Sequence, residues 1–248
     1  MPTEPPPAAP ALAAPLRHLL ETLAPAGGGR TADVGGIDLA SSVPAGSCAA
    51  VIGAVPFAGS VQACGRASEA GALARSRRAD LIAVAWALLA LEPGGRLALI
   101  VPESFLDGAT QAHRAMRRRL VEDNTLLAVI RLRAGLFKAR TRAAVVVARK
   151  GGETGRVGFG ELNAARDVAE LPLRWMERDQ RASPAGFASF FLRREDIGPP
   201  DYRLSVELAG AAAAGEAQVR PAAEILHEIA GLEAEILQGI RDLAGLLK

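Results

Sequence analysis

Hydrophobic and polar positions in the first part of the chain change period from helical to extended. Leucines at positions 16, 19, 20 and 23 recur at helical spacing and predict a short amphipathic helix that ends near the glycines at 27–29. Residues 48–57 then form an apolar run that stops at Pro56, which predicts a buried strand ending in a loop. Residues 24–47 have no assigned structure.

The middle of the chain has the alternation of an α/β sheet. The pattern predicts, in order, an apolar helix (80–91), a central buried strand (96–102), a helix (109–122) and two more strands (126–132 and 143–148). This succession predicts an open α/β sheet with a terminal antiparallel hairpin. Beyond residue 150 the pattern loosens. We therefore expect the α/β domain to span residues 16–150 and residues 151–215 to form an irregular extension and linker.

The end of the chain, residues 216–248, predicts a long amphipathic helix with Pro221 near its start. Its apolar positions are spaced by four, three, four, four, three and four residues: Ile225, Ile229, Leu232, Ile236, Ile240, Leu243 and Leu247. Such a helix either folds back on the domain or pairs with a partner helix. The preceding linker favours a partner, either another protein or a second copy.

Composition narrows the class of protein. Residues 1–15 are rich in Pro and Ala and predict a disordered tail without the character of a signal peptide. No apolar stretch reaches the length of a membrane helix, so we expect a soluble, cytoplasmic protein that does not bind membranes. Neither the two cysteines (Cys48 and Cys64) nor the three histidines (His18, His113 and His227) have metal-site spacing. We expect no metal, and buried free thiols.

Charge is divided unevenly along the chain. Residues 1–150 contain 18 Lys and Arg and 11 Asp and Glu, a net +7, whereas residues 151–248 contain 11 and 16, a net −5. A basic first part suits contact with phosphates and an acidic second part suits contact with protein. A solvated surface would also explain this difference.

Several motifs occur in an order that resembles one family. The run Leu-Glu-Pro-Gly-Gly-Arg-Leu-Ala-Leu-Ile-Val-Pro (91–102) is followed by Glu-Ser-Phe-Leu (103–106), Arg-Arg-Arg-Leu-Val-Glu-Asp-Asn (117–124), Ala-Val-Ile-Arg-Leu (128–132) and Gly-Leu-Phe (135–137). The segments at 191–197 and 201–205 and the Glu/Leu/Ile-rich end continue the order. Together they resemble N-6 adenine DNA methylases, most closely the modification subunit of type I restriction-modification systems. The resemblance implies a partial class I, Rossmann-like methyltransferase sheet that is truncated at its front.

The same resemblance implies where chemistry would occur. Such enzymes are site-specific, adenine-specific DNA methyltransferases that use an Asn/Asp-Pro-Pro-Phe/Tyr motif after the fourth strand. The Asn side chain and the first Pro carbonyl hold the amine hydrogens, and the aromatic ring stacks on the flipped adenine. The matching positions here are Ala54, Val55, Pro56 and Phe57. Phe57 can still stack, but Ala54 has no acceptor for the amine, so activity is uncertain. A strand end with a core Phe would look the same.

S-adenosylmethionine is the cofactor that the resemblance implies. Its loop requires an apolar strand before the glycines, whereas the glycines at 27–29 and at 35–36 follow the predicted helix. We therefore expect that this chain alone does not bind the cofactor, and its binding residues stay unassigned.

Basic residues are the candidate contacts to double-stranded DNA. Three follow the Gly-Leu-Phe motif and three lie on the helix after Pro102: Lys138, Arg140 and Arg142, and Arg114, Arg117 and Arg118. They would neutralise phosphates, or they would form an ordinary solvated basic surface.

Three functions agree with these features. The first is a catalytically impaired methylase-like subunit that contacts DNA or acts as a scaffold. The second is an adenine methyltransferase that works when a partner chain completes it. The third is an interaction module whose C-terminal helix binds a specificity-type subunit or a second copy.

Overall fold

The computed structural model describes residues 12–34, 44–60, 77–133, 135–137, 142–163 and 189–205. All of them belong to one compact unit, which spans Met1–Ala211. The Pro/Ala tail up to residue 11, Cys64, and the predicted helix at 216–248 with all seven of its apolar positions lie outside the described residues.

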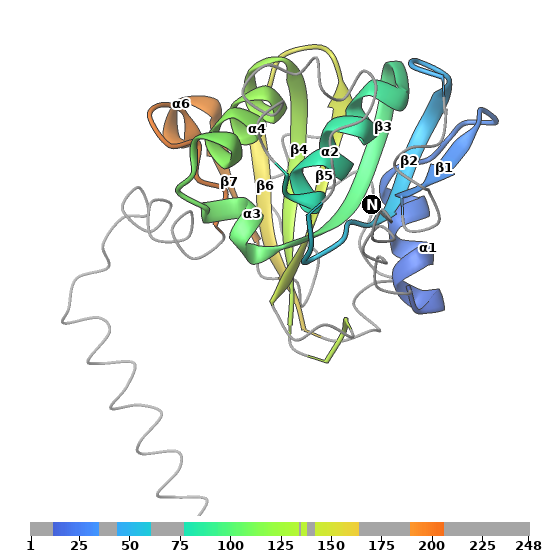
Figure 1. Ribbon diagram of the computed structural model, residues 1–248, viewed down its shortest axis with the longest axis horizontal. Helices are drawn as coiled ribbons and strands as arrows, with labels where there is room; N and C mark the ends of the chain where they lie inside the picture. Colours follow the sequence, from blue (N-terminus) through green and yellow to red (C-terminus); the bar gives the residue numbers. More distant parts are fainter. Residues whose placement is uncertain are drawn as a thin grey trace, which may run out of the picture. The chain divides into compact units, whose positions relative to one another are not determined.

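A sheet with helices on both faces forms this unit (Figure 1). Its seven described strands are β1 (Thr31–Asp33), β2 (Cys48–Ala54), β3 (Leu91–Pro102), β4 (Asn124–Leu132), β5 (Ala143–Lys150), β6 (Arg156–Leu162) and β7 (Ser189–Arg193). Their order across the sheet is β1-β2-β3-β5-β4-β6-β7. The predicted mixed α/β sheet is confirmed.

Five of these strands run in the same direction. β1, β2 and β3 are parallel neighbours, β5 is antiparallel to both β3 and β4, and β6 is parallel to β4. β1, β2, β3, β4 and β6 therefore end at one side of the sheet, which we call the carboxyl edge. In open α/β sheets this is the side where ligands bind.

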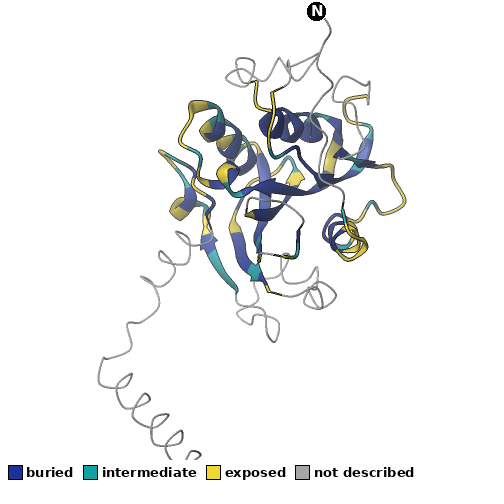
Figure 2. Ribbon diagram, turned by 60° about the horizontal axis from the view of Figure 1, so that its bottom comes forward, coloured by how far each residue is buried: buried dark blue, intermediate teal, exposed yellow. Residues whose placement is uncertain are grey.

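The helices α1 (Ala14–Leu23), α2 (Ala79–Ala90) and α4 (Gln111–Glu122) agree with the helices that the sequence predicts. α1 lies below the sheet in Figure 2, and α2 and α4 lie above it. The four leucines of α1 are at most 3% exposed and pack with the residues Ala50, Ile52 and Ala54 of β2. Burial of each leucine contributes roughly 1.5–3 kcal/mol, which is why a helix of ten residues stays in place.

The sheet continues past residue 150, where the sequence pattern predicts an irregular extension. β6 pairs with β4, and β7 pairs with β6 as an antiparallel edge strand. Phe159 of β6 is fully buried and stacks on Phe190 of β7, with ring centroids 5.5 Å apart. The expected end of the α/β domain at residue 150 is therefore too early, because Gly158 and Gly160 interrupt the hydrophobic pattern of a strand that is nevertheless buried.

Two short helices complete the described elements, α3 (Glu103–Asp107) directly after β3 and α6 (Arg194–Ile197) directly after β7. After α6, the segment 198–205 packs on α3 and α4: the Leu204 amide donates to the Leu106 carbonyl at 2.9 Å. Within the described ranges, no helix has the length and apolarity needed to cross a membrane.

Candidate functional site

The four positions that match the methylase motif lie at the carboxyl edge, between β1 and β3. Ala54 is the last residue of β2, and the Val55 amide still donates to the Ile100 carbonyl of β3 at 3.0 Å. Pro56 has no amide hydrogen with which to continue the ladder, so the strand ends there. The sequence therefore predicts correctly that a buried strand stops at Pro56.

Ala54 and Val55 are both fully buried, and their side chains contain only carbon and hydrogen. Ala54 packs in the cluster that includes the leucines of α1. The position of the motif's amide side chain is therefore apolar, and the side chain of Ala54 has no atom that could accept a hydrogen bond from an amine.

Phe57 contacts the second motif that carries the resemblance. Its ring lies 5.3 Å from that of Phe137, in Gly-Leu-Phe, with the two planes tilted by 45°. Phe137 is only 7% exposed, whereas Phe57 is partly buried against the same core cluster. Both interpretations of Phe57 thus have a physical basis: the ring packs against the core, and part of it reaches the surface of the edge.

A charged cluster lies farther along the same edge, at the ends of β3 and β4 and the start of β5. We call Glu103, Arg131 and Arg142 the edge triad. Arg131 Nη2 is 3.0 Å from Glu103 Oε1, and Arg142 Nη1 is 3.9 Å from Glu103 Oε2. Of these three residues, Arg142 alone is predicted from the sequence as a DNA contact. Glu103 stands immediately after the central strand in the sequence. This position is the signal that indicates a charged cluster of Glu103 and Arg131 at the edge.

The candidate DNA contacts have different surroundings. Lys138 and Arg140 lie outside the described residues, and Arg142 is at the carboxyl edge with its side chain 66% exposed. On α4, Arg114 pairs with Asp201 at 2.9 Å and Arg118 pairs with Glu122 at 2.6 Å.

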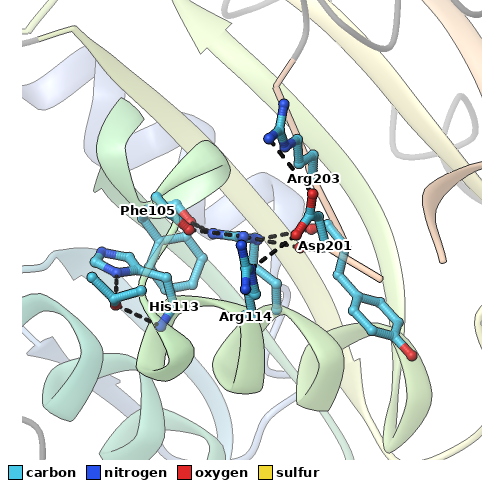
Figure 3. A network of polar contacts seen from close by, with 9 residues as sticks. Phe105, His113, Arg114, Asp201 and Arg203 are labelled. Atoms are coloured by element: carbon cyan, nitrogen blue, oxygen red, sulfur yellow. Dashed lines mark hydrogen bonds and ion pairs between the residues drawn. The ribbon is translucent and has the colours of Figure 1, made fainter. Parts of the chain in front are cut away.

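Arg117 corrects the prediction of a DNA contact at that position, because its side chain is fully buried. It donates to the carbonyls of Phe105 and Gly108 at 3.0 Å, of Asp201 at 2.9 Å and of Tyr202 at 2.8 Å. Burial lowers the pKa of Arg117 to about 10, so the guanidinium keeps its charge at neutral pH. The contacts join α3 and α4 to the segment 198–205, and Figure 3 shows Phe105 and Asp201 on either side of this network. Arg117 is therefore a structural clamp with no surface for a phosphate.

His113 lies beside the network, on the side of Phe105 in Figure 3. It is 3% exposed, and its Nδ1 lies 2.6 Å from Thr110 Oγ1, while the Nε2 atom has no hydrogen-bond partner among the described residues. Burial, followed by the nearby charge of Arg78, lowers the pKa of His113. The histidine thus stabilises the fold best in its neutral form.

A strand precedes the second glycine pair, contrary to expectation. β1 ends at Asp33, directly before Val34 and the glycines at 35–36, which lie outside the described residues. The sequence pattern misses this strand because it is three residues long and not apolar. The glycines at 35–36 therefore do follow a strand, although this strand is not the apolar one that a cofactor loop requires.

At the ends of β1 and β2, the described residues present one carboxylate, Asp33, which accepts a hydrogen bond from Arg17. Within the described ranges, no three His, Cys, Asp or Glu side chains are grouped as a metal site. Cys48 is a buried free thiol.

Solved structures place this fold in a class. The type I restriction-modification methyltransferase subunit from Streptococcus thermophilus is 17% identical, with a TM-score of 0.53 over 69% of this chain and 40% of that one. The type IIG restriction endonuclease BpuSI is 18% identical, with a TM-score of 0.51 over 65% of this chain and 21% of that one. A chain of a type I restriction-modification complex is 18% identical, with a TM-score of 0.46 over 81% and 45%. The first two of these structures, with TM-scores above 0.5, show that the fold is methyltransferase-like.

The family follows from the sequence itself. The sequence model of the N-6 DNA Methylase family matches residues 48–178, more than half of the chain. The chain belongs to this family, as its ordered motifs predict. No curated protein matches the chain significantly by sequence. The chain spans less than half the length of the similar solved proteins.

Proposed function

We propose that this chain is a catalytically impaired member of the N-6 DNA methylase family that acts as a DNA-contacting or scaffold subunit. The observation that carries the proposal is Ala54, a fully buried methyl group at the first position of the motif. Methyl transfer from S-adenosylmethionine to adenine needs an acceptor at this position, because the amine lone pair is otherwise delocalised into the ring. Loss of one such transition-state contact costs about 3–4 kcal/mol, or roughly two to three decades of rate.

Contact with double-stranded DNA is the function that the rest of the carboxyl edge supports. Arg142 is largely exposed there, and the first 150 residues carry a net charge of +7. Lys138 and Arg140 precede Arg142 in the same connection between β4 and β5. Such residues bind phosphates through charge-assisted hydrogen bonds that carry no base specificity.

A second candidate is an adenine methyltransferase that becomes active when another chain supplies the cofactor loop and the missing acceptor. The observation in its favour is the partly exposed ring of Phe57, which contacts Phe137 at the edge. This function predicts methylation in a complex and none with the isolated chain. A specificity-type subunit or a second copy, bound by the helix predicted at 216–248, would be the partner.

The interaction module is the third candidate, in which this predicted helix is the only functional part. Deletion of residues 216–248 should then abolish partner binding and leave the domain folded.

The test combines cofactor binding with transfer. S-adenosylmethionine is titrated calorimetrically into the full-length chain, with and without double-stranded DNA, and transfer of a labelled methyl group to DNA is followed. We expect no binding heat and no transfer. Micromolar binding together with transfer by the unaltered chain would refute the impairment.

A gain-of-function pair isolates the role of Ala54. If the cofactor binds, alone or in a complex, A54N with V55P restores the acceptor and the turn and should raise transfer by at least tenfold, because a single acceptor is worth about two decades or more. The matched control is A50N, which also puts an amide at a fully buried position on the same face of β2. A gain with A54N/V55P but not with A50N supports the proposal. Equal behaviour of the two variants contradicts it.

A further inference from the structure

The edge triad joins two arginines from different strands through one carboxylate. Each oxygen of Glu103 faces a different guanidinium: Oε1 faces Arg131 at 3.0 Å and Oε2 faces Arg142 at 3.9 Å. The three groups together carry a net charge of +1. A phosphate group accepts hydrogen bonds from two arginines in a similar way, with different oxygens bound by different guanidinium groups.

The sheet fixes these three residues relative to one another. Ala144 of β5 pairs with Val101 of β3 on one side and with Arg131 of β4 on the other. Because neighbouring strands are about 4.8 Å apart, Arg131 must extend across β5 to reach the end of β3. The methyl side chain of Ala144 leaves room for this. The Glu103 amide also donates to the Arg142 carbonyl at 3.0 Å, which sets the start of β5 beside α3.

The two arginines differ in exposure in a way that suits a ligand from solution. The Arg131 side chain is 14% exposed and Glu103 is 25% exposed, whereas Arg142 is 66% exposed. One guanidinium is therefore held within the edge and the other extends into solvent. A partly buried cation strengthens an ionic contact, because solvent screens it less.

We infer that Arg131 and Arg142 form a site for one backbone phosphate of DNA and that Glu103 occupies this site as an internal phosphate mimic in the free protein. The inference rests on the proposed DNA contact and adds a competitor to it. When DNA binds, the phosphate replaces the Glu103 carboxylate between the two guanidiniums, and the carboxylate turns to solvent. No bond is made or broken. Glu103 thus weakens DNA binding compared with what the two arginines alone would provide.

The inference makes a signed prediction: removal of an acidic charge at this position tightens DNA binding more than its removal elsewhere. The variant is E103Q, which keeps the shape of the side chain. The matched control is E21Q, which removes the same charge from an exposed pair on α1, where Glu21 lies 3.9 Å from Arg17. Binding of a labelled DNA duplex to the full-length chain is measured by fluorescence anisotropy at several salt concentrations.

We expect E103Q to bind DNA roughly three- to fivefold more tightly than the unaltered chain at about 50 mM salt, and E21Q to change affinity by less than about 1.5-fold. R142Q, at an exposed position that should not affect folding, is expected to bind more weakly and to reduce the salt slope by about one. In R142Q/E103Q the gain should largely disappear, because the two residues act on the same phosphate. Thermal unfolding of each variant shows whether it is folded.

The outcomes separate this inference from the proposed function. If neither the unaltered chain nor E103Q binds DNA, the proposed DNA contact is wrong and the phosphate site for DNA is wrong with it. If the unaltered chain binds but E103Q behaves like E21Q, or only lowers the melting temperature, the triad is an ordinary structural ion pair and the inference alone is overturned. If inorganic pyrophosphate stabilises E103Q while DNA affinity is unchanged, the site takes a small phosphate compound, and the assignment to DNA is again overturned.

Discussion

Replacement of Arg117 by Met should destabilise the domain far more than the same change at the next residue. Met keeps the length and apolar stem of the side chain but removes a guanidinium that donates to four backbone carbonyls. Hydrogen bonds from a charged donor contribute about 1.5–3 kcal/mol each, but these four share one cation and are not additive. Water can reach part of the site once the segment 198–205 moves away. We therefore expect a loss of about 3–4 kcal/mol, as for a broken buried ionic contact.

The measurement is denaturant unfolding followed by circular dichroism, with hydrogen exchange of individual amides alongside it. The Leu204 amide, which donates to the Leu106 carbonyl, should lose protection in R117M before the amides of the central strands do. The control is R118M, because Arg118 is 66% exposed and forms one ion pair with Glu122. An exposed ion pair of this kind contributes little to stability, so R118M should stay close to the unaltered chain.

An intermediate variant tests the geometry of the clamp. R117K keeps the charge, but an ammonium group has three donors and is too compact to reach four carbonyls on two segments. It should fall between the unaltered chain and R117M. The clamp would be refuted if R117M destabilised no more than R118M, or if the Leu204 amide stayed as protected as in the unaltered chain.

Three further predictions concern other parts of the fold. Burial lowers the pKa of His113 below its usual 6.5, so the unfolded chain binds more protons than the folded one at mildly acidic pH. The free energy of unfolding should therefore be highest above about pH 6.5 and should fall below it. In urea titrations, H113Q should flatten this part of the stability profile. T154V should lower the free energy of unfolding by about 1–3 kcal/mol, because Thr154 Oγ1 accepts from the Leu126 amide and donates to the Asn124 carbonyl, both at 2.9 Å. In the same denaturation assay the control T22V, at an exposed hydrogen bond on α1, should change it by less than about 0.5 kcal/mol. F137A should lower stability by about 3 kcal/mol, measured by thermal unfolding, since it leaves a cavity beside Phe57; a loss below about 1 kcal/mol would mean that the aromatic pair does not support the edge.

The sequence predicts the centre of this fold better than its margins. Apolar runs lie at 97–101 in β3, at 126–130 in β4 and at 143–148 in β5, and α2 and α4 are bounded by polar residues or breakers, so local pattern and tertiary burial agree there. β3 itself begins earlier than predicted, at Leu91, and includes the exposed residues 92–94. β1 is Thr-Ala-Asp, and nothing in those three residues indicates a strand. It is extended because it pairs with β2, which is a tertiary cause that the local pattern does not contain.

The burial of Arg117 is partly predictable from its position on the helix. Three consecutive arginines look equivalent as charges, but successive residues of a helix point about 100° apart. On α4, the positions His113, Met116, Leu120 and Val121 are buried, and Arg117 belongs to the same face. Helical spacing therefore distinguishes Arg117 from Arg118 in the sequence, whereas the four carbonyls that make its burial tolerable become visible only in the fold.

At the carboxyl edge, the end of β2 is apolar and the ends of β3 and β4 are charged, and the two proposed activities depend on these different parts. The end of β2 presents Ala54 and Phe57, and methyl transfer needs a polar acceptor there. The edge triad lies at the ends of β3 and β4 and the start of β5, and phosphate binding needs only its charges. Loss of the acceptor at Ala54 therefore need not affect DNA binding. A54N/V55P should therefore leave DNA affinity unchanged, whereas R142Q should weaken it. If the two variants changed DNA affinity equally, the end of β2 and the edge triad would not act independently.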